Sequence, residues 1–192
     1  MLHSWEALKP VVLQPAGDVT HAFVNLGAHD YREAARYIHQ LPYRRNSDPI
    51  APLIVIQEGR GTCSTKHALL CRLALEQNLH VALIVGVYQM NERNTPGVGA
   101  VLQRYSLGSI PEAHCYLRAF GKRIDVTREV FPSEPIVEFI HEEEIAPDQI
   151  GAHKRDLHRS FLCHWMAQEA LAVTLEDLWS IREQCIAALS AL

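Results

Sequence analysis

A glycine-interrupted loop runs directly into a helical pattern near the middle of the chain, and this junction constrains the fold more than any other stretch. Gly59 and Gly61 break the regular pattern just before it. From Thr62 or Cys63 onward, apolar residues recur at helical spacing, which predicts a helix to about Asn78. The junction therefore places a thiol where a loop becomes a helix.

The remaining sequence predicts both helices and strands around this junction. Asp30 is placed to cap one helix, and Thr174 with Asp177 forms a capping-box-like start for another, although Asp replaces the usual Glu or Gln. The expected elements are a helix in DYREAARYIHQLPY, a buried strand or an apolar linker at 52–56, a strand in HVALIVGVYQM, a long connection over 91–111 with one helical turn near 100–104, a hairpin in EAHCYLRAFGKRIDVTR, and helices at about 154–170 and 175–190.

Composition places the chain among ordinary globular proteins. Its 192 residues are enough for one domain with a core, and 48% are hydrophobic and 21% charged. A net charge of -4 gives no electrostatic reason to expect nucleic-acid binding. Five cysteines without a paired framework indicate reduced thiols and a cytoplasmic location. Because the N-terminal residues do not resemble a secretory signal and no apolar run has the length of a membrane span, no membrane association is expected.

A cysteine at a helix start has the setting that a nucleophile needs. The partial positive charge and the N–H groups of a helix N-terminus lower the pKa of a thiol. Gly59 and Gly61 would let the backbone approach a substrate carbonyl, and the backbone N–H of Cys63 would then help to bind an oxyanion. The alternative is that Cys63 packs as a small buried residue of the core.

A nucleophilic thiol also needs a base, and the base needs an orienting group. His114 and Asp125 are the best pair, because they lie on the two arms of the expected hairpin. If the turn centres on Phe120 and Gly121, Asp125 lies opposite Tyr116 and diagonally from His114, with the two Cα atoms roughly 7–8 Å apart. A turn one residue later would separate the pair by about 13 Å along the strands. A catalytic pair therefore requires the earlier turn or a bulge.

Three stretches in this order resemble the transglutaminase-like cysteine superfamily. GTCSTKHALLCRLALEQNLHVALIVG is similar to the family's cysteine helix and the strand after it, and HCYL and IDVT are similar to its His and Asp motifs. Tyr116 fits an aromatic residue that many members carry two positions after the His, whereas Cys115 has no functional explanation. The stretch RGTC also resembles, more weakly, the RGGxC of arylamine N-acetyltransferases. The resemblance covers about Ile54 to Arg128.

The resemblance implies an α+β, papain-like core in which the cysteine-bearing helix packs on an antiparallel sheet, with added C-terminal helices. It implies a hydrolase or acyltransferase that acts on an amide or ester of a peptide, protein or small molecule, through a thioester acyl-enzyme and without a cofactor. Cys63 would be the nucleophile, His114 the base and then the acid, and Asp125 the residue that orients His114. Gln57 has the spacing of an oxyanion-hole side chain in papain-like proteases, and its alternative is a solvated loop residue.

A metal site is the main competing interpretation of the cysteine helix. Cys63, His67 and Cys71 recur every four residues and share one helix face, and thiolate and imidazole are zinc ligands. His114 or Cys115 would supply a fourth ligand. The tight Cys-x2–4-Cys spacings of structural zinc sites are absent, so no metal is expected, and His67 and Cys71 are expected to pack in the core.

The runner-up function is a protein-interaction module that keeps the scaffold without catalysis. In either case we expect one domain over 1–192, with its core at about 52–128 and a helical extension at about 153–192. The apolar face of the last helix is expected to pack in the core, or else to form a homodimer through the C-terminal helices.

Overall fold

The computed structural model describes residues 4–128, 136 and 138–190, and its fold is α+β. The chain divides into two compact units. The first unit takes the chain through Val85, then Cys115 onward through the hairpin, then Glu143–Gly151. The second takes Gly86–His114, the described residues before Glu143, and the chain from Ala152 on. The expectation of a single domain stays a prediction.

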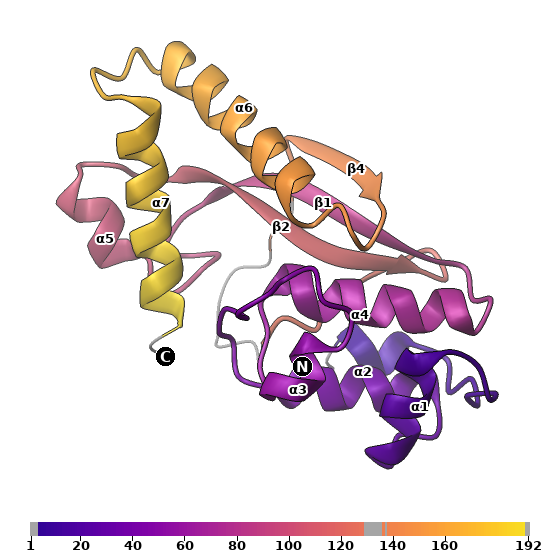
Figure 1. Cartoon of the computed structure of the whole chain (residues 1–192). Coiled ribbons are helices and arrows are strands. Elements are labelled where there is room, and N and C mark those ends of the chain that lie inside the picture. The colour runs from indigo at the N-terminus through magenta and orange to yellow at the C-terminus, as the bar shows by residue number, and fades with distance from the viewer. Residues whose placement is uncertain (1–3, 129–135, 137, 191–192) are drawn as a thin grey trace. The chain divides into compact units, whose positions relative to one another are not determined.

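Helices dominate the first unit, and α4 is the element on which the others pack. Figure 1 shows α1, α2 and α3 beside α4, in agreement with their contacts. The expected cap of α2 is confirmed, because the Asp30 side chain accepts a hydrogen bond from the Glu33 N–H at 2.8 Å. The elements are η1 (Ser4–Ala7), α1 (Asp18–Asn25), α2 (Tyr31–Gln40), α3 (Ile54–Glu58) and α4 (Cys63–Glu76).

The apolar stretch before the loop is a short helix, so the expectation of a strand or linker at 52–56 is wrong. α3 buries Ile54 and Val55 and ends at Gly59, which adopts the left-handed conformation that glycine tolerates best. A run of β-branched residues this short carries no period that separates a strand from a helix, so packing against α4 decides the outcome.

One sheet of four antiparallel strands, in the order β3-β2-β1-β4, contributes residues to both units. The strands are β1 (Val81–Met90), β2 (Ile110–Ala119), β3 (Lys122–Ile124) and β4 (His141–Ile145). The acidic run at 142–144 lies within the edge strand β4, where alternate residues are exposed. Acidic residues are poor strand formers, so the sequence did not predict a strand here, and β4 forms through its pairing with β1.

The hairpin of β2 and β3 turns where a catalytic His114 and Asp125 require. Leu117 pairs with Ile124 and Ala119 with Lys122, which leaves Phe120 and Gly121 as the two-residue turn. Both turn residues have positive φ, as a type I′ turn demands. Of the two possible turns, the structure therefore has the earlier one, and Asp125 follows directly after the last paired residue.

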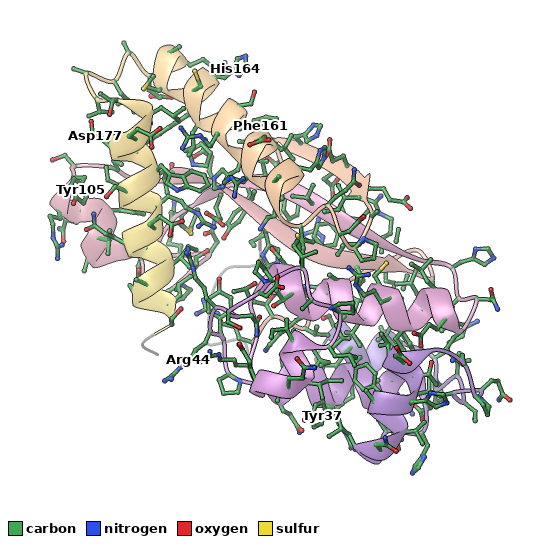
Figure 2. The ribbon with its side chains drawn as sticks, viewed as in Figure 1. Tyr37, Arg44, Tyr105, Phe161, His164 and Asp177 are labelled. Carbon is green, nitrogen blue, oxygen red and sulfur yellow. The ribbon has the colours of Figure 1, made fainter. Side chains whose placement is uncertain are left out.

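In the second unit, α5 (Gly99–Arg104) provides the expected helical turn, and α6 (Ala152–Gln168) and α7 (Leu175–Leu189) form the C-terminal pair. The predicted capping box is present at the start of α7, where Figure 2 labels Asp177, because Thr174 and Asp177 exchange hydrogen bonds. The apolar face of α7 is buried at Leu178, Ile181, Cys185, Ile186 and Leu189. Among the described residues, no helix combines the length and apolarity that a bilayer span requires.

Candidate active site

Two glycines shape the loop that delivers Cys63. Gly59 has a φ of 60° and nothing within 4 Å of where a Cβ would lie, so its requirement is conformational. Gly61 is required by packing, because a Cβ there would lie 2.9 Å from Lys66 Cγ and 3.0 Å from Thr65 Oγ1. The loop therefore lies tightly against the first turn of α4, where any larger residue would displace it.

The segment before α3 holds this loop in place. Tyr43 forms a parallel bridge with Gly61, whose N–H donates to the Pro42 carbonyl at 3.1 Å. The Asn46 side-chain amide donates to the Arg60 carbonyl at 2.9 Å, and its oxygen accepts from the Thr65 hydroxyl at 2.7 Å. Asn46 thereby joins the loop to the first turn of α4, a role that its position in a polar stretch did not reveal.

Cys63 is the first residue of α4 and is 6% exposed. The residue before it, Thr62, accepts a side-chain hydrogen bond from the Thr65 N–H, and the Thr65 hydroxyl accepts from the Thr62 N–H at 2.9 Å. This capping box fixes the helix start at the thiol. Sγ of Cys63 lies 3.8 Å from the hydroxyl oxygen of Ser64. Cys63 thus lies at a helix N-terminus, as the nucleophile interpretation requires, and is buried, as the packing alternative requires.

Asp125 is held in place by its backbone, while its carboxylate is partly exposed. The Ser4 hydroxyl donates to the Asp125 carbonyl at 2.6 Å and accepts from the Asp125 N–H at 2.8 Å. Oδ1 of Asp125 accepts from the Thr127 N–H at 2.9 Å and lies 3.6 Å from Nε2 of His67. The side chain is 35% exposed. The imidazole that this carboxylate lies beside is that of His67.

His67 is fully buried and both of its ring nitrogens have hydrogen-bond partners. Nε2 accepts from the Val126 N–H at 2.9 Å, so the ring proton is on Nδ1, which donates to the Cys63 carbonyl at 2.7 Å. A neutral imidazole used in this way has no lone pair left to act as the base for Cys63. His67 is therefore buried in the core, as expected from the sequence.

Lys66 is a residue of the candidate site that the sequence interpretation missed. It is fully buried, and its Nζ donates to the carbonyls of Leu41 at 2.6 Å and Thr127 at 2.8 Å. Burial lowers the pKa of Lys66 to about 8, and the charges of Asp125 and Cys63 act in the opposite direction. The available signal was its helical position, because Lys66 occurs three residues after Cys63 on the face that packs inward.

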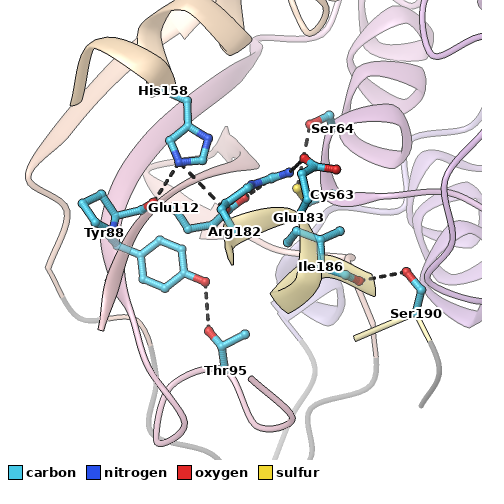
Figure 3. A network of polar contacts seen from close by, with 11 residues as sticks. Cys63, Ser64, Tyr88, Thr95, Glu112, His158, Arg182, Glu183, Ile186 and Ser190 are labelled. Carbon is cyan, nitrogen blue, oxygen red and sulfur yellow. Dashed lines mark hydrogen bonds and ion pairs between the residues drawn. The ribbon is translucent and has the colours of Figure 1, made fainter. Parts of the chain in front are cut away.

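His114 lies in β2, in the second unit, and is partly exposed. Its ring meets the ring of Tyr88 edge-on, with centroids 6.2 Å apart. The Tyr88 hydroxyl and Thr95 Oγ1 are 2.9 Å apart, as Figure 3 shows, and the Phe139 ring also contacts Tyr88. An aromatic wall thus supports the His114 imidazole and is tied in turn to the loop after β1.

Two residues before His114 on the same strand, Glu112 is the centre of a buried ion-pair cluster. Arg182 donates to both of its carboxylate oxygens, at 2.6 and 2.7 Å, and Nε2 of His158 lies 3.9 Å away (Figure 3). Burial would raise the pKa of Glu112, but the charges of Arg182 and His158 outweigh it and hold the pKa at about 2. Burial lowers the pKa of His158. The cluster attaches α6 and α7 to the strand that carries His114.

The other residues of interest fall in three settings. Gln57 is exposed, as a solvated residue would be, but it lies in the helix α3 and not in a loop. Cys71 is buried in α4, where burial raises the pKa of its thiol to about 11, and Cys115 is buried in β2 next to His114. Across residues 4–128, 136 and 138–190, no group of three or more His, Cys, Asp or Glu side chains is placed to hold a metal ion.

Comparison with protein-family models, with curated proteins and with solved structures finds no match for the chain. The resemblance to the transglutaminase-like superfamily therefore rests on the sequence motifs. Cys63 and Asp125 belong to the first unit and His114 to the second, with the boundary at the peptide bond between His114 and Cys115. The complete Cys63–His114–Asp125 triad stays a prediction.

Proposed function

We propose that this protein is a cysteine-dependent hydrolase or acyltransferase that cleaves an amide or ester through a thioester acyl-enzyme. The observation that carries the proposal is the position of Cys63, the first residue of α4, at a capped helix start after a loop that Gly59 and Gly61 allow to pack tightly. A helix N-terminus stabilises a thiolate, and it presents N–H groups to an oxyanion. The motifs that resemble the superfamily supply the remaining roles.

In the proposed reaction, Sγ of Cys63 attacks the substrate carbonyl carbon, and its proton passes to His114. His114 then protonates the leaving amine or alcohol as the carbon–heteroatom bond breaks, which leaves a thioester. Water, or an acceptor amine, attacks the thioester and gives a proton to His114, which returns it to the departing thiolate. Asp125 orients His114 throughout, and the backbone N–H of Cys63, with Gln57 as a further candidate, would bind the oxyanion.

The substrate class under this proposal is a peptide, a protein or a small amide or ester, and the reaction needs no cofactor. All five cysteines are thiols in the structure, which fits a reducing compartment, and we place the activity in the cytoplasm. A homodimer through the C-terminal helices is a further proposal. It would have to use their exposed surfaces, because the main apolar face of α7 is already buried within the chain.

The proposal is tested with an activated ester. We expect p-nitrophenyl acetate to acetylate Cys63, with the adduct found on the Cys63 peptide by mass spectrometry and removed by hydroxylamine. Cys63→Ser should abolish the adduct, and His114→Ala should slow it by about 100-fold. Cys163→Ser is the matched control, because Cys163 is the exposed cysteine and should leave the Cys63 adduct unchanged. Equal acetylation of Cys63 with and without His114 would refute the proposed base.

A second candidate function is an interaction module without catalysis. It is favoured by the Asp125 carboxylate, which accepts from the Thr127 N–H and lies beside His67, contacts that a purely structural residue would also make. This candidate predicts no acyl adduct on Cys63 with any activated ester, and full binding of its partner by the Cys63→Ser variant.

A further inference from the structure

Two adjacent polar residues of α4 are both fully buried, which is unusual for a lysine and a histidine in a helix interior. Lys66 and His67 are each 0% exposed. Burial of a cation and an imidazole costs free energy unless their polar atoms are bonded. Hydrogen bonds to both side chains must therefore offset that cost, and one hydrogen bond from each side chain reaches the same short segment.

The segment is the one that begins at Asp125. The Val126 N–H donates to Nε2 of His67 at 2.9 Å, and the Thr127 carbonyl accepts from Nζ of Lys66 at 2.8 Å. Val126 supplies a donor and Thr127 an acceptor, and both are bonded by neighbouring side chains in one turn of α4. The stretch follows β3 and lies outside the paired part of the hairpin.

Each side chain also has a second attachment. Nδ1 of His67 donates to the Cys63 carbonyl at 2.7 Å, and Nζ of Lys66 donates to the Leu41 carbonyl at the end of α2 at 2.6 Å. His67 thus connects the nucleophile's own backbone to the residue after Asp125 with a single ring. Only the neutral imidazole can do so, since one nitrogen donates and the other accepts.

We propose that Lys66 and His67 form a clamp, made of these four hydrogen bonds, that positions Asp125 relative to Cys63. Both are positioning residues, since they act through Asp125 and Cys63 and not on the substrate. The inference rests on the proposed function for its catalytic meaning. The clamp itself is a physical attachment that exists whether or not Cys63 reacts.

Substitutions at His67 separate its two bonds. Glutamine can keep an acceptor near the Nε2 position, whereas asparagine can keep a donor near the Nδ1 position but cannot reach Val126. We expect amide hydrogen exchange of Val126 to accelerate by about 10-fold or more in His67→Asn, relative to globally exchanging amides, and by less than about threefold in His67→Gln. A Val126 amide in His67→Asn that exchanges no faster than in the wild type would overturn the clamp.

The second readout is the pH dependence of Cys63 alkylation by iodoacetamide, followed on the Cys63 peptide. Loss of the clamp should raise the apparent pKa of Cys63 by about 1 unit in His67→Asn, toward the ordinary thiol value of about 8.5. Glu76→Gln is the matched control, because Glu76 attaches the other end of α4 through the Val19 and Thr20 N–H groups. It should change neither readout. A faster Val126 amide with an unchanged Cys63 profile would overturn the positioning role.

Lys66 provides an independent variant if His67→Asn does not fold. Lys66→Met removes the charge and both donors, and Lys66→Arg keeps them, so we expect the Cys63 pKa to rise in the first by about 0.5–1 unit and to recover in the second. Equal profiles in the two variants would refute the role of Lys66. If wild-type Cys63 titrates near its ordinary value and ignores His114→Ala, the proposed function fails, while Val126 exchange still decides whether the clamp exists.

Discussion

The ion pair between Glu112 and Arg182 gives a stability prediction that can be worked from the structure. The pKa of Glu112 falls from 4.5 to about 2 in the folded protein. At about 1.36 kcal/mol per pKa unit, this difference corresponds to about 3 kcal/mol of stability near neutral pH. Arg182→Met should therefore destabilise the second unit by about 3 kcal/mol, because it leaves a buried carboxylate without its cation.

The pH dependence of this loss follows from the direction of the shift. The folded pKa of Glu112 lies below its unfolded value, so its contribution is complete above 4.5 and is lost as the pH falls toward about 2. The difference between wild type and Arg182→Met should shrink over that window. Adding Glu112→Gln to Arg182→Met should recover about 1–2 kcal/mol, since it removes the unpaired charge.

Urea unfolding followed by tryptophan fluorescence measures the effect. In a Trp5→Phe, Trp165→Phe background, Trp179 alone reports, and it lies under the Arg182 guanidinium at 5.5 Å. Arg159→Met is the matched control, because Arg159 is also 5.5 Å from the Trp179 ring but pairs with Glu176, which is 74% exposed. It should cost less than about 1 kcal/mol. A similar loss in both variants, or no recovery in the double variant, would refute the reasoning.

Three further predictions concern the first unit. The pKa of Lys66 falls from 10.5 to about 8 on folding, so the unfolded chain binds more protons than the folded chain between these pH values. Stability, measured by urea unfolding at several pH values, should therefore rise with pH across that window in wild type but not in Lys66→Met. Identical pH slopes in the two proteins would contradict this prediction. Gly61→Ala should cost about 1–3 kcal/mol in thermal unfolding, because its Cβ would lie 2.9 Å from Lys66 Cγ, and a neutral result would show that the loop relaxes freely. Asn46→Ala should cost about 1–3 kcal/mol in urea unfolding, because the Arg60 carbonyl and the Thr65 hydroxyl lose a partner, whereas an unchanged midpoint would remove Asn46 from the support of the loop.

Local signals in the sequence predicted the elements that local physics determines. The α4 helix and the Thr174–Asp177 capping box were predicted, because helical period and capping side chains act over a few residues. The hairpin was predicted with two possible turns, and the structure has the one at Phe120–Gly121 that a catalytic pair requires. The short helix α3 and the edge strand β4 were not, because each depends on contact with another element: α3 packs on α4, and β4 pairs with β1. The sequences of α3 and β4 themselves contain no pattern that indicates these contacts.

The candidate site divides in the same way. Cys63 was assigned to a helix start from its own neighbours, and that assignment is confirmed. The attachment of Lys66 to Thr127 joins residues that are 61 positions apart, so no local pattern contained it. His67 was expected to pack in the core, and the structure adds that its ring nitrogens bond the Cys63 carbonyl in the same helix and the distant Val126 N–H. Long-range polar pairs of this kind become visible only once the fold is known.

We propose that Cys63 is a nucleophile activated by His114. The most direct test is the rate of Cys63 alkylation by iodoacetamide as a function of pH, in wild type and in His114→Ala. We predict an apparent thiol pKa of Cys63 below about 7.5 in wild type and a rise of about 1 unit or more in the variant. A wild-type Cys63 that titrates near about 8.5, with the same profile in His114→Ala, would show that His114 does not activate it.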